Sequence, residues 1–272
     1  MISPEISSLA SFTPAKSSAS SDDVIPTVSA RKGPKNIYPW KTNIITTVFW
    51  IGEGGSSISS TDNIGSAWDE EWRTSNGGND SPNNRNGYAS AYHAARVNPF
   101  YIALPFNDLV YPDKARRWIP AGWARKPKDG RPVSACQHRW VEIKPEDGRG
   151  RVCYAQWEDV GPLRYDHAEY VFGSERPNTF TRAGLDVSPA VAQYLGIDSD
   201  HRAMTRWRFV DDEDVPPGVW LKYEEEAVLF NAIHNMKNGK PSRSLPLQTD
   251  DATQDTFNNI DTNKKKVSAA KG

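Results

Sequence analysis

Three acidic residues stand where a carboxyl group could take part in acid–base chemistry. Asp159 ends the run CYAQWED, and Val-Gly-Pro follows it directly. Asp186 lies two residues before Ser188, and Glu169 precedes Tyr-Val-Phe. General acid–base catalysis needs a group that donates a proton, and many mechanisms use a second carboxylate as base or nucleophile. We therefore take Asp159, Asp186 and Glu169 as the candidate catalytic acids.

Each acid also has a structural interpretation. Asp159 can accept backbone N–H bonds and hold the turn that follows it. Asp186, near the start of a helix, would have its charged form stabilised, which predicts a lowered pKa and a role as base or electrostatic stabiliser. The apolar neighbours of Glu169 would raise its pKa, as a general acid requires, unless it lies in a solvated loop.

Aromatic residues are abundant, with ten tryptophans and ten tyrosines. They suit a well-packed β domain, and their faces can also stack on sugar rings. Trp68 and Trp72 lie at i and i+4 in a polar segment, so they are the first candidates for stacking, with packing onto the domain as the alternative. Trp157 and Tyr154 are further candidates, although some rings of their strand must face the core. Asp108 completes the candidate binding residues, with a turn-forming role as its alternative.

The two cysteines, Cys136 and Cys153, flank a candidate hairpin. A disulfide between them would suit an oxidising compartment, and two buried free thiols are the alternative. No group of Cys and His has the spacing of a zinc site, so we expect no metal and no cofactor.

Charge limits the class of partner, because 33 basic residues nearly balance 34 acidic ones. Nucleic-acid binding usually requires a basic face, so a nucleic-acid partner is not expected. The largest basic cluster runs from Lys114 to Lys128, is broken by Trp118, Pro120 and Trp123, and is interpreted as a solvated loop. No apolar run reaches about 18 residues, which predicts no membrane span.

One folded unit is expected between two polar ends. Residues 1–36 are rich in Ser, Ala, Pro and Lys, and residues 246–272 in Asp, Asn, Thr and Lys, which predicts disordered tails. The N-terminus lacks a signal-peptide pattern, so either the protein is intracellular or its leader is missing from this chain. Residues 53–97 are mostly Ser, Asn, Gly and Asp, which predicts either a functional loop or a segment with local structure.

Five segments have the composition of strands, namely 43–52, 98–108, 138–145, 150–159 and 204–210. The pair Asp147-Gly148 predicts a hairpin between the third and the fourth of them.

Two helices are expected. Ser188 as N-cap and Pro189 as first residue begin the shorter one, which Gly196 ends. The second is expected over 223–245, with acids at its start and lysines near its end.

The order of these motifs resembles the double-psi β-barrel of rare lipoprotein A-like proteins, expansins, barwin-like proteins and family 45 glycosidases. WVEIKPEDGRGRVCYAQWEDVGP (140–162) is similar to the rare lipoprotein A pattern of a strand, an Asn/Asp-Gly turn and a strand closing in N-D-x-G-P. AGLDVSPAVAQYLGI (183–197) is similar to that family's I-D-L-S and following helix. The resemblance implies a mainly β fold, with a six-stranded double-psi β-barrel over 37–222, a short capped helix, the 53–97 insertion and a C-terminal helix.

The resemblance also implies where the acids lie. It places Asp159 and Asp186 on neighbouring loops of one groove. HAEYVFG (167–173) weakly resembles a segment of the membrane-bound lytic transglycosylase A family and puts Glu169 where that family has its catalytic Asp. Glu53 follows the first strand, two residues out of register with an acid of family 45 glycosidases. The chain departs from the family in its insertion, which replaces the segment that holds the family's catalytic Glu.

By this resemblance we expect an extracytoplasmic, monomeric protein that binds or cleaves peptidoglycan or another cell-wall polysaccharide. As an enzyme it would be a glycoside hydrolase or a lytic transglycosylase. The alternatives are an expansin-like module without hydrolytic activity and a barwin-like inhibitor that binds proteins. The catalytic alternative requires two carboxylates that converge, at least one with a raised pKa.

Overall fold

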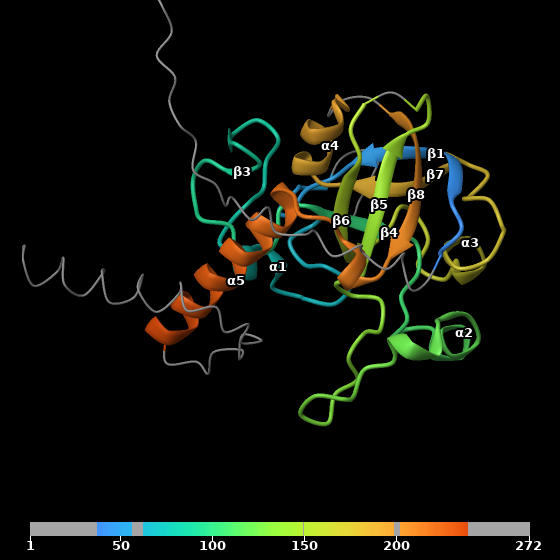
Figure 1. Cartoon of the computed structure of the whole chain (residues 1–272). Helices are drawn as coiled ribbons and strands as arrows, with labels where there is room; N and C mark the ends of the chain where they lie inside the picture. The colour runs from blue at the N-terminus through green and yellow to red at the C-terminus, as the bar shows by residue number, and fades with distance from the viewer. Residues whose placement is uncertain (1–36, 56–61, 149, 199–201, 239–272) are drawn as a thin grey trace, which may run out of the picture. The chain divides into compact units, whose positions relative to one another are not determined.

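A computed structural model describes residues 37–55, 62–148, 150–198 and 202–238 (Figure 1). The expected tails, 1–36 and 246–272, lie outside these residues. The helices and strands, in chain order, are β1 (Lys41–Val48), α1 (Trp72–Asn76), β2 (Arg85–Asn86), β3 (Ala89–Ser90), β4 (Tyr101–Leu104), α2 (Pro112–Trp118), the 3₁₀ helix η1 (Ala121–Trp123), β5 (Trp140–Pro145), β6 (Cys153–Val160), α3 (Ala168–Val171), β7 (Ala183–Val187), α4 (Pro189–Leu195), β8 (Ala203–Val210), the 3₁₀ helix η2 (Asp212–Asp214) and α5 (Val219–Lys237).

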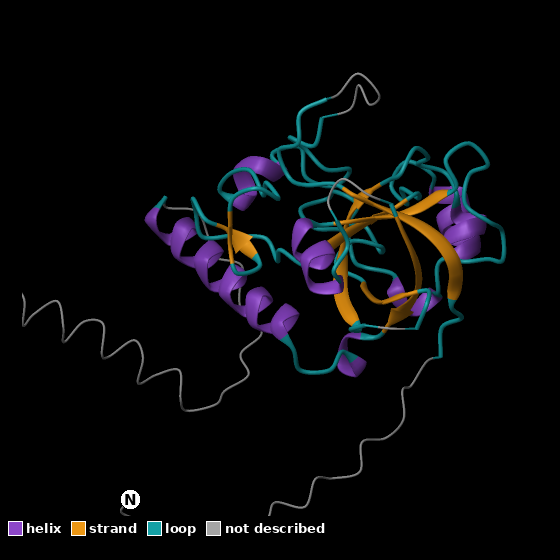
Figure 2. Ribbon diagram, turned by 90° about the horizontal axis from the view of Figure 1, so that it is seen from above, coloured by secondary structure: helices purple, strands orange, loops and turns teal. Residues whose placement is uncertain are grey.

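Six strands close a barrel in the order β1-β7-β4-β6-β5-β8, and Figure 2 shows them curving around a common interior. The pairs β1–β7 and β4–β6 are parallel, and the other four pairs are antiparallel. The prediction of a mainly β chain with a closed six-stranded barrel and a C-terminal helix is confirmed.

Strand β8 follows the period of two that is typical of a barrel wall with one face in the core. In β8, Thr205, Trp207 and Phe209 are buried, and Arg206 and Arg208 between them are not. Inside the barrel Trp157 stacks on Phe209, with ring centroids 6.0 Å apart and planes 28° apart. Large aromatic side chains therefore fill the interior and hold the wall that carries the candidate site.

The predicted hairpin is present, because β5 and β6 pair antiparallel with Ile143 opposite Cys153. The sixth strand, β7, was not expected as a strand of its own. Its sequence, AGLDV, belongs to the segment that we interpreted only as the approach to α4. It pairs with β1 on one side and with β4 on the other, so it closes the wall between them.

The short helix α4 begins and ends as predicted. The Ser188 hydroxyl accepts the Val191 N–H at 3.2 Å, Pro189 is the first helical residue, and Gly196 has a left-handed φ of 74°. Ser188 also donates to the Pro99 carbonyl at 2.6 Å, which ties the start of α4 to the segment before β4. The cap therefore fixes both the helix and the end of β7.

The C-terminal helix α5 packs on the barrel through its first turns. The Trp220 ring lies 5.0 Å from that of Tyr154, and Glu224 accepts a hydrogen bond from Gln156 at 2.8 Å. The helix begins before and ends before the predicted range of 223–245. Among the described helices, none has the length and apolar character that crossing a membrane requires.

The described part of the insertion has local structure, one of the two predicted alternatives. Helix α1 buries Trp72 against Phe49 and Tyr101, with ring centroids 6.1 and 5.2 Å away. The Tyr101 hydroxyl donates to Asp80 at 3.0 Å and accepts the Ile51 N–H at 3.0 Å. The insertion is thus fastened to the outer face of β4 by a small core of its own.

Candidate functional site

One row of side chains crosses four neighbouring strands of the barrel. Thr47 of β1 is in register with Asp186 of β7, and Ala103 of β4 is in register with both Asp186 and Asp159 of β6. Residues directly opposite each other in a sheet project from the same face. Ala103 packs with the aromatic group beneath the insertion, whereas Ile102 and Leu104 belong to the main core. The row therefore faces out of the barrel, under the insertion.

Asp159 is buried, with only 8% of its surface exposed. Its Oδ1 accepts the Ala67 N–H at 2.8 Å, so the insertion touches this carboxyl group directly. The pKa of Asp159 is raised to about 7, chiefly by burial and also by the charges of Asp186 and Glu158, against the opposing effect of hydrogen bonds from the N–H groups of Ala67 and Val160. Asp159 thus has the raised pKa that a general acid requires at neutral pH.

The pKa of Asp186 is raised, so our prediction of a lowered pKa is wrong. The Thr47 hydroxyl donates to its Oδ1, and its Oδ2 lies where a side chain on Gly161 would come within 3.3 Å. The pKa of Asp186 is raised to about 6, chiefly by burial and also by the charge of Glu53, against the opposing effect of the Thr47 hydrogen bond. Asp186 lies on β7, before the Ser188 cap of α4. Because its pKa is raised overall, the effect of burial outweighs any stabilisation of the charged carboxylate by the start of the helix.

Glu53 joins this pair of acids from the insertion side of β1. Its carboxylate accepts a hydrogen bond from Asn63 Nδ2 at 3.0 Å, and the Asn63 backbone N–H donates to its carbonyl at 2.9 Å. Burial raises the pKa of Glu53, against the effect of hydrogen bonds from Trp50 and Asn63. Glu53, Asp186 and Asp159 therefore form a chain of carboxyl groups, which we call the acid row, in which each charge acts on the next.

A histidine–glutamate pair lies beside the acid row. Glu158 is buried, and its Oε1 lies 2.5 Å from Nδ1 of the half-exposed His138. His138 has a left-handed φ of 66°, which non-glycine residues seldom adopt. The charge of Glu158 contributes to the raised pKa of Asp159, so Glu158 is electrostatically coupled to the acid row. Through Glu158, the imidazole ring of His138, which reaches solvent, is linked to the same row.

Glu169 does not have the raised pKa predicted for a general acid. Burial does raise its pKa, but hydrogen bonds from its own backbone and from Lys114, with the charge of Lys114, outweigh burial and lower it overall. The Lys114 and Glu169 side chains form an ion pair, with Nζ and Oε1 3.1 Å apart. Glu169 lies on α3, where Tyr170 and Val171 enter the core and the glutamate side chain does not.

The candidate binding residues are dispersed. Trp72 and Trp157 are buried, so neither presents a ring face to a ligand, and Tyr154 is half-buried against α5. Asp108 accepts hydrogen bonds from Ser134 Oγ at 2.7 Å and the Ala135 N–H at 2.6 Å, and so anchors a loop. Two of the candidates lie next to the acid row: Trp68 follows Ala67, whose N–H binds Asp159, and the Trp157 indole N–H donates to the Asp159 carbonyl at 2.7 Å. The Trp68 ring packs edge-on against Trp157 at 5.6 Å.

Cys136 and Cys153 are free, buried thiols, so the disulfide alternative is wrong. Burial raises the pKa of both thiols well above its usual range. Their neighbourhood is apolar core, where a thiol acts as a small hydrophobic group.

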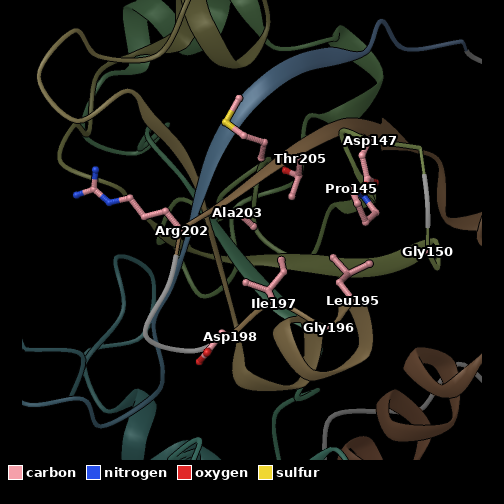
Figure 3. Close-up of a pocket in the computed structure, with 11 residues that line it drawn as sticks. Pro145, Asp147, Gly150, Leu195, Gly196, Ile197, Asp198, Arg202, Ala203 and Thr205 are labelled. Carbon is pink, nitrogen blue, oxygen red and sulfur yellow. The ribbon is translucent and has the colours of Figure 1, made fainter.

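A separate pocket of about 400 Å³ lies at the end of the barrel where the β5–β6 turn, the end of α4 and the start of β8 meet (Figure 3). Leu195, Ile197 and Met204 give it apolar walls, and Asp147 lies at its edge. No member of the acid row lines this pocket. The described part of the chain holds no group of three or more His, Cys, Asp or Glu side chains that could bind a metal ion.

Sequence reasoning missed Thr47, Ala103 and Gly161, which place the two aspartates. Thr47 is one of several threonines in a β-branched strand, and nothing in its type or spacing indicates a contact 139 residues away. Only the register of β7 brings it to Asp186.

No family model matches the sequence, and no protein with a curated description matches it.

Proposed function

We propose that this chain is an exported protein that cleaves glycosidic bonds of peptidoglycan or another cell-wall glycan, with the acid row as its catalytic centre. One observation carries the proposal: Asp159 and Asp186 face the same side of the wall across Ala103, and both have raised pKa values. Groups poised near neutral pH in this way are what general acid–base catalysis uses.

The pKa values suggest a division of roles. Asp159, with a pKa of about 7, keeps its proton in about half of the molecules at neutral pH. Asp186, with a pKa of about 6, is mostly ionised there. Asp159 is therefore the general acid that protonates the leaving oxygen. Asp186, held by Thr47, is the carboxylate that activates water or stabilises positive charge on the sugar.

The register favours hydrolysis with inversion. Asp159 and Asp186 are each one strand away from Ala103, so their backbones are about 10 Å apart. Inverting enzymes hold their two carboxyl groups about 6.5–9.5 Å apart to admit water, and retaining enzymes about 5 Å. The lean of Asp186 towards Gly161 shortens the gap between the carboxyl groups relative to the backbones.

The family assignment is part of the same proposal. We assign the barrel to the double-psi class that includes rare lipoprotein A-like proteins and expansins. Support comes from the closed six-stranded wall with two parallel pairs, the β5–β6 hairpin and the capped helix α4. The sequence motifs that resemble this class lie in these same elements.

A non-catalytic expansin-like module is the second candidate, and the contact between Asp159 and Ala67 favours it. A buried carboxyl group that holds the insertion through a hydrogen bond has a structural use without any reaction.

A product assay on insoluble glycans distinguishes the two candidates. The wild-type protein, Asp159→Asn, Asp186→Asn and the control Glu71→Gln would be incubated with peptidoglycan sacculi, cellulose and chitin. Glu71 is an exposed acid of the insertion, outside the acid row. Soluble fragments from the wild type and Glu71→Gln, reduced at least 100-fold in both aspartate variants, support catalysis. New reducing ends indicate hydrolysis, and anhydro-sugar ends indicate a lytic transglycosylase. Binding without release supports the module, and no binding to any glycan contradicts both.

A further inference from the structure

The segment between β4 and β5 concentrates positive charge in a chain that is almost neutral. Residues 112–133, which we call the basic arm, contain seven Lys and Arg and two Asp, whereas the whole chain has 33 basic and 34 acidic residues. Lys126, Lys128 and Arg131 are exposed on the loop after η1, and Arg116 and Arg117 are exposed on α2. Figure 1 shows α2 and this loop at the same end of the barrel.

Five exposed apolar or aromatic side chains adjoin the basic arm. We call them the apolar ledge: Leu109, Val110, Tyr111, Leu163 and Tyr165. Val110 is 60% exposed and Leu163 is 59% exposed. Leucine and valine gain nothing from such exposure in water, since burying either side chain is favourable.

The ledge is one surface, although its residues come from two loops. The Asn107 N–H donates to the Tyr165 carbonyl at 2.7 Å, and the Tyr111 N–H donates to the Asn107 carbonyl at 3.1 Å. Lys114 of α2 reaches back to the Asp166 carbonyl at 2.8 Å. These bonds fix the two loops beside each other and join the ledge to the first turn of the basic arm.

Leu163 has an unusual backbone. Its φ of 62° is left-handed, which is rare for a bulky residue. The loop thus holds an apolar side chain in solvent at a backbone position that glycine or asparagine would fill more easily.

From this combination we infer that the apolar ledge and the basic arm bind the surface of an anionic lipid bilayer. Basic side chains are attracted to anionic headgroups, and apolar and tyrosine side chains enter the boundary between headgroups and acyl chains. A soluble polyanion would use the charges and gain little from Val110 or Leu163. An anionic bilayer would bind both the basic arm, through its headgroups, and the apolar ledge, through its acyl chains. This inference does not depend on the glycan activity proposed above.

Vesicle co-sedimentation of the full chain tests the inference. The vesicles would consist of phosphatidylcholine alone or with about one-third phosphatidylglycerol, at low and at near-physiological salt. A charge variant, Lys126→Glu/Lys128→Glu/Arg131→Glu, removes exposed charges of the basic arm. A ledge variant, Val110→Ser/Leu163→Asn, removes apolar surface, and asparagine suits the left-handed backbone at 163. The matched control, Arg73→Glu/Arg202→Glu/Lys237→Glu, makes the same charge change at exposed positions elsewhere.

We expect the wild type to bind the anionic vesicles and not the neutral ones, and to bind less as salt rises. Each cation near the surface contributes a factor of about five, so the charge variant should bind at least about 100-fold more weakly. The ledge variant should bind roughly tenfold more weakly, and the control should stay within about twofold of the wild type. Circular dichroism would establish that all variants are folded.

Three results would overturn the inference. One is a wild type that does not bind anionic vesicles at low salt. Another is equal loss of binding in the charge variant and the matched control, which would show that only net charge matters. The third is binding to soluble heparin without binding to vesicles, which would point to a polyanion as the partner.

Discussion

Asp159 and Asp186 are related through one small residue: each lies directly opposite Ala103, on either side of β4. The alanine has no polar group and no bulk that could separate the two carboxyl groups. The charge of Asp186 therefore acts on Asp159 and helps to raise the pKa of Asp159. A cationic side chain at 103 would lower both pKa values, whereas the observed arrangement retains a proton in the acid row near neutral pH.

The raised pKa of Asp159 predicts a stability that falls as pH rises. The folded protein holds this proton up to a pKa of about 7, and the unfolded chain loses it near the usual value of 3.8. The folded state therefore binds more protons between these values. The contribution is fully present below about pH 4 and is lost as pH rises through 7, at a cost of at most about 4 kcal/mol.

Asp159→Asn removes this dependence. The free energy of unfolding of the variant, relative to the wild type, should therefore rise between pH 4 and pH 8. Asparagine Oδ1 can still accept the Ala67 N–H, so the variant keeps the contact with the insertion. Urea unfolding at several pH values measures the difference. Parallel pH profiles of the two proteins would show that Asp159 ionises normally.

Glu169 gives a second prediction, because Lys114 holds it ionised outside the acid row. Glu169→Gln should leave glycan cleavage within about twofold of the wild type. It should cost less than about 1 kcal/mol of stability, since the ion pair is partly solvated. The assay on sacculi and a thermal unfolding curve measure the two quantities. A 100-fold loss of cleavage in Glu169→Gln would contradict this prediction and indicate that Glu169 is catalytic.

The two cysteines give a third prediction. Both thiols are buried and have raised pKa values, so the reactive thiolate is scarce in the folded protein. A thiol reagent such as iodoacetamide should label Cys136 and Cys153 only after denaturant unfolds the chain. Dithiothreitol should leave Tm unchanged. Fast labelling of the native protein, or a lower Tm after reduction, would contradict free buried thiols.

Elements that depend on neighbours in sequence could be predicted, and elements that depend on distant partners could not. The cap at Ser188, the stop at Gly196 and the turn at Asp147-Gly148 follow from local chemistry. Strand β7 has only five residues, and partners on β1 and β4 determine its pairing. The composition of these five residues did not indicate a strand distinct from the segment that leads into α4.

The same limit explains why the pKa shift of Asp186 was predicted in the wrong direction and why that of Glu169 could not be decided from the sequence. The residues next to Glu169 in sequence are apolar, but its side chain meets Lys114, which is 55 residues away. Asp186 precedes a helix, but burial and Glu53 determine its pKa. The two aspartates could be named as candidates, because Asp159 closes the run CYAQWED and Asp186 lies just before the Ser188 cap. Their environments come from the insertion and from strand register.

Gly161 provides the last prediction, because the Asp186 carboxyl group occupies the space beside it. A Cβ at 161 would lie 3.3 Å from Asp186 Oδ2 and 3.8 Å from the Ala103 Cβ. Gly161→Ala should therefore displace the Asp186 carboxyl group and weaken its bond with Thr47, without a large loss of stability. A shift of about 1 Å in a reacting group can cost up to about 100-fold in rate, so we expect cleavage to fall roughly 10- to 100-fold. The control is Gly122→Ala, since a Cβ there meets nothing within 4 Å. Cleavage of sacculi and the carboxyl ¹³C shift of Asp186 during a pH titration measure the effect. An unchanged titration with unchanged cleavage would show that Asp186 tolerates the methyl group, and the acid row would then not depend on the space at Gly161.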